Sequence, residues 1–354
     1  MRVLVTGGAG YIGAHVVVDL LLAGYQVRVV DDLSSGSREA LRRAAGIAGR
    51  SFWLFEGDVA DRELLRGALE GVEAVLHLAA YTAVGASMVE PERYLRNNLG
   101  GTASLIEAMQ AAGVRRIVYA STAAVYGAQS GSPIGEQAPL HPESPYGYTK
   151  AEGERMLDWM VRCRGWSAVS LRYFNPVGAH LSGRIGEPIA RASNLVPSVL
   201  ASLTDPDRPL TIFGTDYPTP DGTGLRDFIH VSDLSRAHLL ALSALDHAGH
   251  RVFNVGSGRP HSVREVLAAC ARVTGRPVSA CEGPRRVGDV AVAVADPRRI
   301  EADLGFRARI ELDEMVASAW RWWTGAPYGP EPSPRAVRGP GLGGGTLIGP
   351  ERSG

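Results

Sequence analysis

A tyrosine and a lysine four residues apart form the first pair in this sequence that could move a proton. Tyr146 and Lys150 follow Ser144 and Pro145 at the start of a predicted helix. The spacing places both side chains on one helical face, one turn apart. An ammonium group beside a phenol favours the phenolate, so we expect the pKa of Tyr146 to fall from about 10 toward neutral. Such a phenol can act as general base or acid when an alcohol and a ketone are interconverted.

A hydroxyl group is expected beside this pair. Thr122 lies in the segment STAAVYG (residues 121–127), directly after a predicted strand at residues 116–120. The carboxyl end of that strand places the hydroxyl at the edge of the sheet, where ligands bind in open α/β folds. There it can hold the reacting oxygen beside the tyrosine. A YxxxK spacing is common by chance, and it is the combination with Thr122 that makes the set specific.

A glycine-rich turn offers a site for a dinucleotide. The segment TGGAGYIG (residues 6–13) lies between a predicted strand and a predicted helix and contains the spacing GxGxxG. Glycine lets the backbone turn tightly and approach a pyrophosphate, whose charge then faces the positive N-terminus of the helix. Gly8, Gly10 and Gly13 form this pattern, and Gly7 adds the spacing GxxGxxG.

Acidic and small residues end the neighbouring predicted strands. Asp31 and Asp32 close the second strand, where a carboxylate accepts hydrogen bonds from a ribose diol and repels a 2′-phosphate, so NAD is favoured over NADP. Asp58 follows the third strand and can meet the adenine amino group, or it can cap a helix instead. Small residues after the fourth strand would leave room for the cofactor, although core packing explains them too. These residues are Leu78, Ala79 and Ala80.

Alternating strands and helices must position these groups. Apolar runs separated by helical periodicity indicate parallel strands with helices on both faces of the sheet. The sequence therefore predicts an α/β fold with a doubly wound parallel sheet of the Rossmann type and a smaller C-terminal substrate-binding domain. The first five predicted strands are residues 3–5, 26–30, 52–55, 74–78 and 116–120. Two predicted helices in the same part of the chain are residues 12–22 and 92–112.

The second half of the chain is less regular. Residues 1–175 are predicted to form the dinucleotide-binding domain, to which residues 232–257 return, and residues 176–327 mainly the substrate-binding domain. Residues 329–354 contain eight glycines and five prolines, and we expect a disordered tail.

Composition excludes several classes of protein. The 354 residues carry 37 basic and 37 acidic side chains, which argues against binding to nucleic acid or to an anionic membrane surface. No apolar run is long enough to span a bilayer, and no leader is recognisable. Three scattered cysteines favour a reducing, cytoplasmic environment. His77, His180 and His230 lack the spacing of metal ligands, so no metal is expected.

Six motifs make the chain similar to a known family. They are TGGAGYIGAH, ASTAAVYG, SPYGYTK, LRYFNPVGAH, GTDYPTPDGTGLRDFIHVSDL and NVGSG. The sequence resembles the extended short-chain dehydrogenase/reductase family from residue 1 to about residue 327, and within it the UDP-glucose 4-epimerases. This resemblance implies NAD-dependent interconversion of UDP-glucose and UDP-galactose through a 4-keto-hexopyranose. It also implies a homodimer, which residues 92–112 and 150–164 could form as a four-helix contact.

The resemblance assigns roles to individual positions. Tyr146 would be the base, Lys150 its activating partner on the nicotinamide ribose, and Thr122 the ligand of the sugar O4. Contacts to NAD are implied for Tyr11, Ile12, Asp31, Asp58, Val59, Asn97 and Phe174. Contacts to the UDP-sugar are implied for Asn175, Asn194, Leu195, Leu210, Phe213, Arg226, Arg286 and Asp289. Guanidinium groups suit a diphosphate, although surface ion pairs and a loop cap are alternative roles for the arginines and Asn175.

Two departures from the resemblance affect the expected site. Thr82 replaces a basic residue, which should weaken one contact to the cofactor. Ala293 stands where many of these epimerases have a tyrosine, and a small residue there predicts room for an N-acetylhexosamine.

Three alternative functions remain open from the sequence. A nucleotide-sugar 4,6-dehydratase needs acids after the hydroxyl residue, whereas Ala123 and Ala124 follow Thr122. A UDP-uronic acid 4-epimerase would want an extra cation that the sequence does not locate. A non-catalytic protein that binds NAD or a sugar nucleotide would be expected to lose Tyr146 or Lys150, and both are present.

Overall fold

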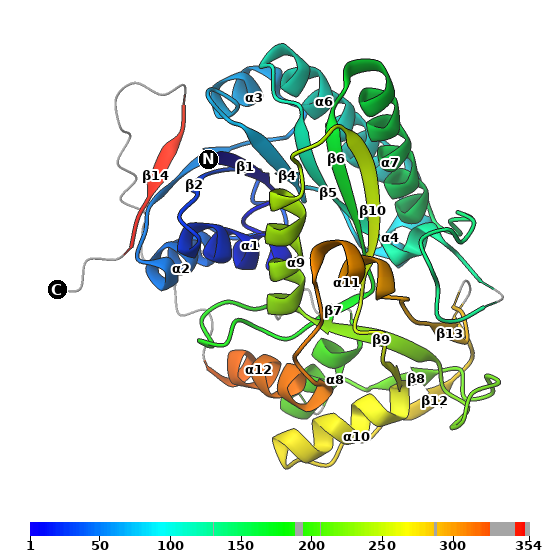
Figure 1. The fold of residues 1–354 in the computed structure, drawn as a ribbon. Helices are drawn as coiled ribbons and strands as arrows, with labels where there is room; N and C mark the ends of the chain where they lie inside the picture. Colours follow the sequence, from blue (N-terminus) through cyan, green and yellow to red (C-terminus); the bar gives the residue numbers. More distant parts are fainter. Residues whose placement is uncertain (130, 188–193, 206, 287–288, 326–343, 351–354) are drawn as a thin grey trace.

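An eight-stranded sheet forms the centre of the larger part of the molecule (Figure 1), in the order β10-β6-β5-β4-β1-β2-β3-β14. The computed structural model describes residues 1–129, 131–187, 194–205, 207–286, 289–325 and 344–350. The strands are β1 (Arg2–Thr6), β2 (Gln26–Asp31), β3 (Phe52–Glu56), β4 (Ala74–His77), β5 (Arg116–Thr122), β6 (Ser167–Tyr173), β10 (Gly249–Val255) and β14 (Thr346–Ile348). Every neighbouring pair is parallel except β3 and β14, so the predicted doubly wound α/β fold is confirmed.

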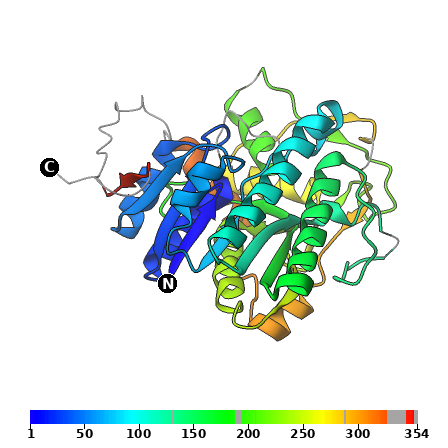
Figure 2. The ribbon, with the colours of Figure 1, turned by 90° about the horizontal axis from the view of Figure 1, so that it is seen from above.

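Helices cover both faces of this sheet (Figure 2). One apolar core lies under α1 (Tyr11–Leu22), α2 (Arg38–Ala48), α9 (Val231–Ser243) and α11 (Arg298–Leu304). A second core lies under α3 (Arg62–Ala68), α6 (Gly101–Ala111) and α7 (Pro145–Arg164). The carboxyl ends of the parallel strands therefore meet at one edge of a layer that is closed on both sides.

The smaller part of the molecule lies beyond that edge (Figure 1) and is built on short strands. In its four-stranded sheet, β9 (Leu225–His230) pairs with β7 (Asn175–Val177), β11 (Pro260–Ser262) and β13 (Val292–Ala293). A separate pair joins β8 (Thr211–Phe213) to β12 (Cys281–Gly283). Three helices enclose its core, namely α8 (Leu195–Thr204), α10 (Val263–Thr274) and α12 (Leu312–Thr324).

The helix predicted over residues 92–112 is interrupted. After α4 (Val84–Val89), the chain forms α5 (Pro91–Tyr94), a π-helix η1 (Leu95–Gly100) and then α6. A Cβ at position 101 would lie 2.7 Å from a methyl group of Val59, so glycine is needed where α6 starts. π-Helical turns are rare and occur often at functional sites.

The predicted disorder of residues 329–354 does not hold for residues 344–350. Strand β14 pairs antiparallel with β3, and Ile348 is buried in the core beside Phe52. The edge of β3 offers unpaired backbone groups, and β14 satisfies them. Residues 329–343 and 351–354 lie outside the described residues.

Candidate active site

Helix α7 brings the predicted tyrosine–lysine pair into the site. The helix starts at Pro145, and the Ser144 hydroxyl accepts a hydrogen bond from the backbone N–H of Gly147 at 3.1 Å. This cap fixes the first turn, which carries Tyr146. Tyr146 is 8% exposed and Lys150 3% exposed. Both predicted side chains are therefore almost fully removed from water.

A close approach of two backbones brings Thr122 to Tyr146. Thr122 ends β5 and caps the short 3₁₀ turn η2 (Ala123–Val125) by accepting a hydrogen bond from Ala124. A Cβ at position 147 would lie 2.5 Å from the carbonyl oxygen of Ala124, so the contact between α7 and η2 requires glycine. As a result the hydroxyl of Thr122 lies near enough to the phenol of Tyr146 to lower the pKa of that phenol.

The pKa values correct one expectation. Burial raises the pKa of Tyr146 to about 12, and the nearby Thr122 hydroxyl opposes this only partly. Burial lowers the pKa of Lys150 to about 7, against the opposing effect of Glu154. The predicted fall of the tyrosine pKa is therefore wrong, because desolvation of the phenol dominates that pKa.

Lys150 has an unusual environment and is the only lysine of the chain. Its ammonium lies 5.0 Å from the centre of the Tyr119 ring, on β5. His77, on β4, is held by the hydroxyls of Thr6 and Thr102 at 2.7 and 3.0 Å, and its pKa falls to about 3 by burial and by the charge of Lys150. His77 is thus a neutral core histidine, as the absence of metal spacing suggested.

The glycine-rich turn forms a cradle at the start of α1. Gly7 has a φ of +72°, and a Cβ at position 13 would lie 2.1 Å from the Gly7 carbonyl oxygen. No side chain caps the N-terminus of α1, so its first N–H groups face the cradle without a side-chain acceptor. Asp31 accepts hydrogen bonds from the backbone of Ala9 and Leu33 at 2.8 and 2.9 Å. The acid predicted to bind the ribose therefore also fixes the turn.

The other predicted cofactor residues lie around this cradle with various partners. Asp32 is exposed and binds Ser34, whereas Asp58 accepts a hydrogen bond from the N–H of Ala60. The hydroxyl of Tyr11 donates to the carbonyl of Gly178 at 2.6 Å. The remaining predicted positions are Gly10 and Ile12 at the start of α1, buried Val59 and Phe174, partly buried Asn97 on η1, and Leu78, Ala79 and Ala80 directly after β4.

Several predicted substrate residues meet around β8, β9 and β13. Arg286 lies over the Phe213 ring at 4.0 Å, and Arg226 pairs with Asp289 at 3.4 Å. Ala293 is directly opposite Arg226 in the sheet. The arginines thus have partners, but Arg226 is only partly buried and Arg286 is exposed, so both remain accessible to an anion.

Other predicted substrate residues lie at the margin of this group. The Asn175 amide donates to the carbonyl of Asp227 at 2.8 Å. Asn194 precedes α8, and its amide donates to Glu187 at 3.2 Å, while Leu195 begins that helix. Leu210 is buried in the apolar core of the smaller part.

Sequence reasoning missed three buried polar residues near the site. The Tyr217 hydroxyl is buried without a hydrogen-bond partner among the described residues. The Asp227 carboxylate accepts from the backbone of Gly258 and Ala295 at 2.9 and 3.1 Å, and so ties β13 to β9. Asn98, next to Asn97 on η1, donates to the hydroxyl of Thr149 at 3.0 Å. Their one signal in the sequence is position, since Tyr217 and Asp227 lie within one of the six motifs and Asn98 adjoins a predicted cofactor residue.

The described residues contain neither a cluster of metal ligands nor a membrane-spanning helix. No group of three or more histidine, cysteine or acidic side chains in this part of the chain could hold a metal ion. No helix among the same residues is both long enough and apolar enough to cross a membrane.

The fold and the glycine-rich turn define a class of protein, the dinucleotide-dependent enzymes, and Tyr146 and Lys150 lie buried on one helix of this fold. Residues 3–256 match the model of the NAD-dependent epimerase/dehydratase family. The chain belongs to this family.

Relatives at high identity extend this result. The chain is 46% identical over 327 residues to a UDP-glucose 4-epimerase of Bacillus subtilis, covering 91% of this chain and 96% of the relative. It is also similar to the solved structure of a UDP-glucose 4-epimerase from Stenotrophomonas maltophila with bound NAD and formylated UDP-arabinopyranose. That structure has a TM-score of 0.89 and 41% identity, with coverage of 92% and 98%. The enzyme from Bifidobacterium longum in complex with NAD+ and UDP has a TM-score of 0.88 and 40% identity, with coverage of 92% and 99%.

Proposed function

We propose that this chain is an NAD-dependent UDP-glucose 4-epimerase, which interconverts UDP-glucose and UDP-galactose through a 4-keto sugar. The observation that carries the proposal is the arrangement of buried Tyr146 and Lys150 with partly buried Thr122 at the carboxyl edge of the sheet. The similarity to UDP-glucose 4-epimerases over nine tenths of the chain supports it.

The cradle at the start of α1 fits NAD. Gly7 and Gly13 let the backbone pack more tightly than a side chain would allow, against Ala79 and within the turn itself, and the N–H groups of the first turn have no side-chain acceptor. Asp31 lies at the end of β2, where a carboxylate favours a ribose diol. When bound, NAD supplies the reversible hydride acceptor for C4 of the sugar.

The chain's own residues handle the proton and the oxygen. Tyr146 takes the proton of the sugar 4-hydroxyl and returns it after the sugar has turned. Thr122, whose hydroxyl lies near the phenol, holds the same oxygen. Lys150 lies one turn away, and its positive charge stabilises the phenolate as it forms. A pKa of about 12 for Tyr146 means that this stabilisation must come with the bound cofactor and substrate.

The second half of the chain holds the nucleotide. Arg226 and Arg286 can bind the diphosphate, and the Phe213 ring under Arg286 offers a surface for the uracil base. Binding energy located on the UDP leaves the sugar free to rotate and present its other face.

Proton NMR of the purified protein with UDP-galactose, without added NAD, tests the proposal. We expect the anomeric signal of UDP-glucose to appear, and to be lost in Tyr146→Phe. A new 4-keto-6-deoxy product would favour the dehydratase. Absence of conversion even with NAD supplied would reject the proposal.

The small side chain at position 293 supports a second substrate class. Ala293 lies opposite Arg226 on β13, so it forms part of the wall beside the expected substrate. We propose that UDP-N-acetylhexosamines are also epimerised, since a methyl group at this position leaves room for the C2 substituent.

A homodimer is also part of the proposal. Large apolar side chains are exposed on α4, η1 and α7, and α7 packs against both α4 and η1. They are Val84, Met88, Val89, Leu95, Tyr148 and Trp159. A patch of this kind fits a second copy of the chain. Light scattering should give twice the mass of the chain, and Val89→Asp should give a monomer.

We place the protein in the cytoplasm, because its three cysteines are all unpaired.

A further inference from the structure

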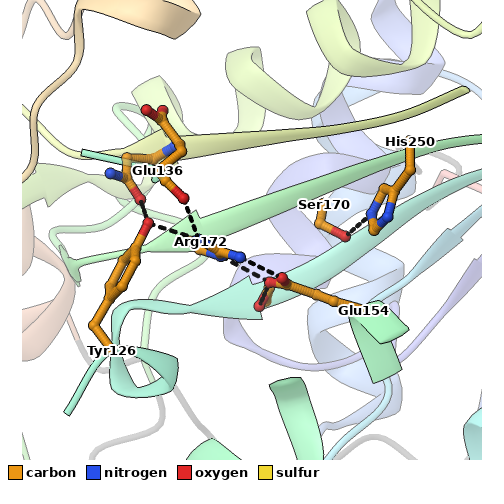
Figure 3. A network of polar contacts seen from close by, with 8 residues as sticks. Tyr126, Glu136, Glu154, Ser170, Arg172 and His250 are labelled. Carbon is orange, nitrogen blue, oxygen red and sulfur yellow. Dashed lines mark hydrogen bonds and ion pairs between the residues drawn. The ribbon is translucent and has the colours of Figure 1, made fainter. Parts of the chain in front are cut away.

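A buried ion pair lies one helical turn beyond the catalytic lysine. Glu154 is on α7 and Arg172 is on β6, and the guanidinium donates to both carboxylate oxygens at 3.0 and 2.6 Å (Figure 3). Both side chains are 5% exposed. A buried pair of this kind must be well satisfied to be tolerated, and its loss on one side leaves an uncompensated charge.

The pair contacts each element that carries a catalytic group. Tyr146, Lys150 and Glu154 follow one another at four-residue intervals on one face of α7. The hydroxyl of Ser121, next to Thr122 on β5, donates to the carboxylate of Glu154. Arg172 lies two residues before Phe174 on the strand that leads to the predicted cofactor and substrate positions.

A second layer of hydrogen bonds holds the guanidinium in place. Arg172 donates to the Tyr126 hydroxyl at 2.8 Å and to the carbonyl of Glu136 at 3.2 Å. Tyr126 in turn donates to the side chain of Asn254 on β10 at 2.7 Å. The arginine therefore cannot easily leave the carboxylate.

This arrangement has a consequence for Lys150. Opposite charges four residues apart on a helix attract each other, and in a dry site the attraction is stronger. A free Glu154 carboxylate would therefore draw the Lys150 ammonium away from Tyr146. Arg172 and Ser121 occupy the carboxylate instead, and Lys150 forms no ion pair with any described residue.

We propose that Glu154 and Arg172 are positioning residues of the active site. Glu154 supplies a negative charge near Lys150, and Arg172 holds the Glu154 carboxylate so that the Lys150 ammonium stays directed to Tyr146. The inference rests on the proposed role of Lys150 in the epimerase.

The charges around Lys150 support this division of roles. Burial lowers the pKa of Lys150, and Glu154 is the neighbour that raises it. The other groups near the ammonium are the Tyr119 ring on β5 and neutral His77 on β4, and Tyr146 lies one turn earlier on the same helical face. Glu154 is thus the one anionic group among these neighbours. Within the ion pair, Glu154 should therefore raise the pKa of Lys150 and Arg172 should lower it.

The single lysine makes the test direct. The holoenzyme grown on [ε-¹³C]lysine gives one lysine side-chain signal, whose pH titration measures the pKa of Lys150. We expect Glu154→Gln to lower this pKa by about 1 to 2 units and Arg172→Met to raise it by a similar amount. The kcat profile should shift in the same direction as the pKa in each variant. Ser170→Ala, on the same strand but bound to His250, is the matched control and should leave the pKa unchanged.

A double variant covers the case in which the single variants do not fold. Glu154→Leu with Arg172→Met replaces the pair by apolar side chains, which proteins often tolerate. It should fold and still lower the pKa of Lys150, because the nearby carboxylate is gone. Shifts in the same direction for both single variants, or a wild-type pKa in the folded double variant, would overturn the inference. Because the NMR titration needs no turnover, expected shifts in an enzyme that does not convert UDP-galactose would reject the proposed function alone.

Discussion

The contact between α7 and η2 gives a sharp test of how the catalytic groups are positioned. A Cβ added to Gly147 would lie 2.5 Å from the Ala124 carbonyl oxygen, whereas ordinary contact begins at 3.4 Å. In Gly147→Ala the two backbones must therefore separate by about 0.9 Å. One of them carries Tyr146 and the other carries Thr122, so either movement changes the distance between these two groups.

The expected effect follows from this movement. Overpacking of this kind costs about 1–3 kcal/mol of stability, which a folded enzyme of this size can survive. A displacement of about 1 Å in an active site can cost roughly 100-fold in rate, and we expect this loss in kcat with a much smaller change in KM. The assay is the initial rate of UDP-glucose formation from UDP-galactose, with the NAD content and melting temperature measured on the same samples.

A matched helical glycine provides the control. Gly85 on α4 has open space where a side chain would begin, with no atom within 4 Å of an added Cβ. Gly85→Ala should therefore keep kcat and gain about 0.5–1 kcal/mol of stability. If Gly147→Ala folds, retains NAD and keeps kcat within about threefold of the wild type, the backbone contact does not position Tyr146 and the reasoning is refuted.

Three further predictions concern the substrate wall, a buried acid and the C-terminal strand. Ala293→Tyr should reduce kcat/KM for UDP-GlcNAc at least tenfold more than for UDP-galactose, and equal rejection of UDP-GlcNAc by wild type and variant would contradict the proposed role. Burial raises the pKa of Glu187 to about 7, so the folded state loses stability as the pH rises from about 4.5 to 7. Glu187→Gln should therefore raise the melting temperature at pH 8 but not at pH 4, and an unchanged pH dependence would refute this. Ile348→Ser should lower the stability by about 2 kcal/mol, with unchanged kcat, because it removes an apolar side chain from the core beside β3; an unchanged melting temperature would mean that β14 does not contribute.

The central sheet was predictable because its strands are buried on both faces. Runs such as residues 52–55 and 116–120 are apolar almost throughout, and helices separate them, so periodicity and composition agree. Strand β14 had no such signal. It is three residues long within a segment rich in glycine and proline, and it forms because the edge of β3 is available to it.

The candidate site was predictable only where chemistry depends on local spacing. Tyr146 and Lys150 share a helical face, and this follows from their separation alone. The pKa of Tyr146 does not, because it depends on how completely the rest of the chain excludes water. Likewise Asn98 binds Thr149, 51 residues away, and no local pattern indicates such a partner.

The use of basic residues in this chain follows the same physical logic. Lys150 is the one lysine, so every other member of the 37 basic residues is an arginine. Arginine keeps its charge in proteins and binds carboxylates with two parallel hydrogen bonds, which is the task of Arg172 on Glu154. Lysine, in contrast, changes its pKa readily when it is buried, and burial lowers the pKa of Lys150 to about 7. Arg172, whose charge is permanent, thus holds the proposed site together, whereas the proposed catalytic residue Lys150 is a base whose charge can change.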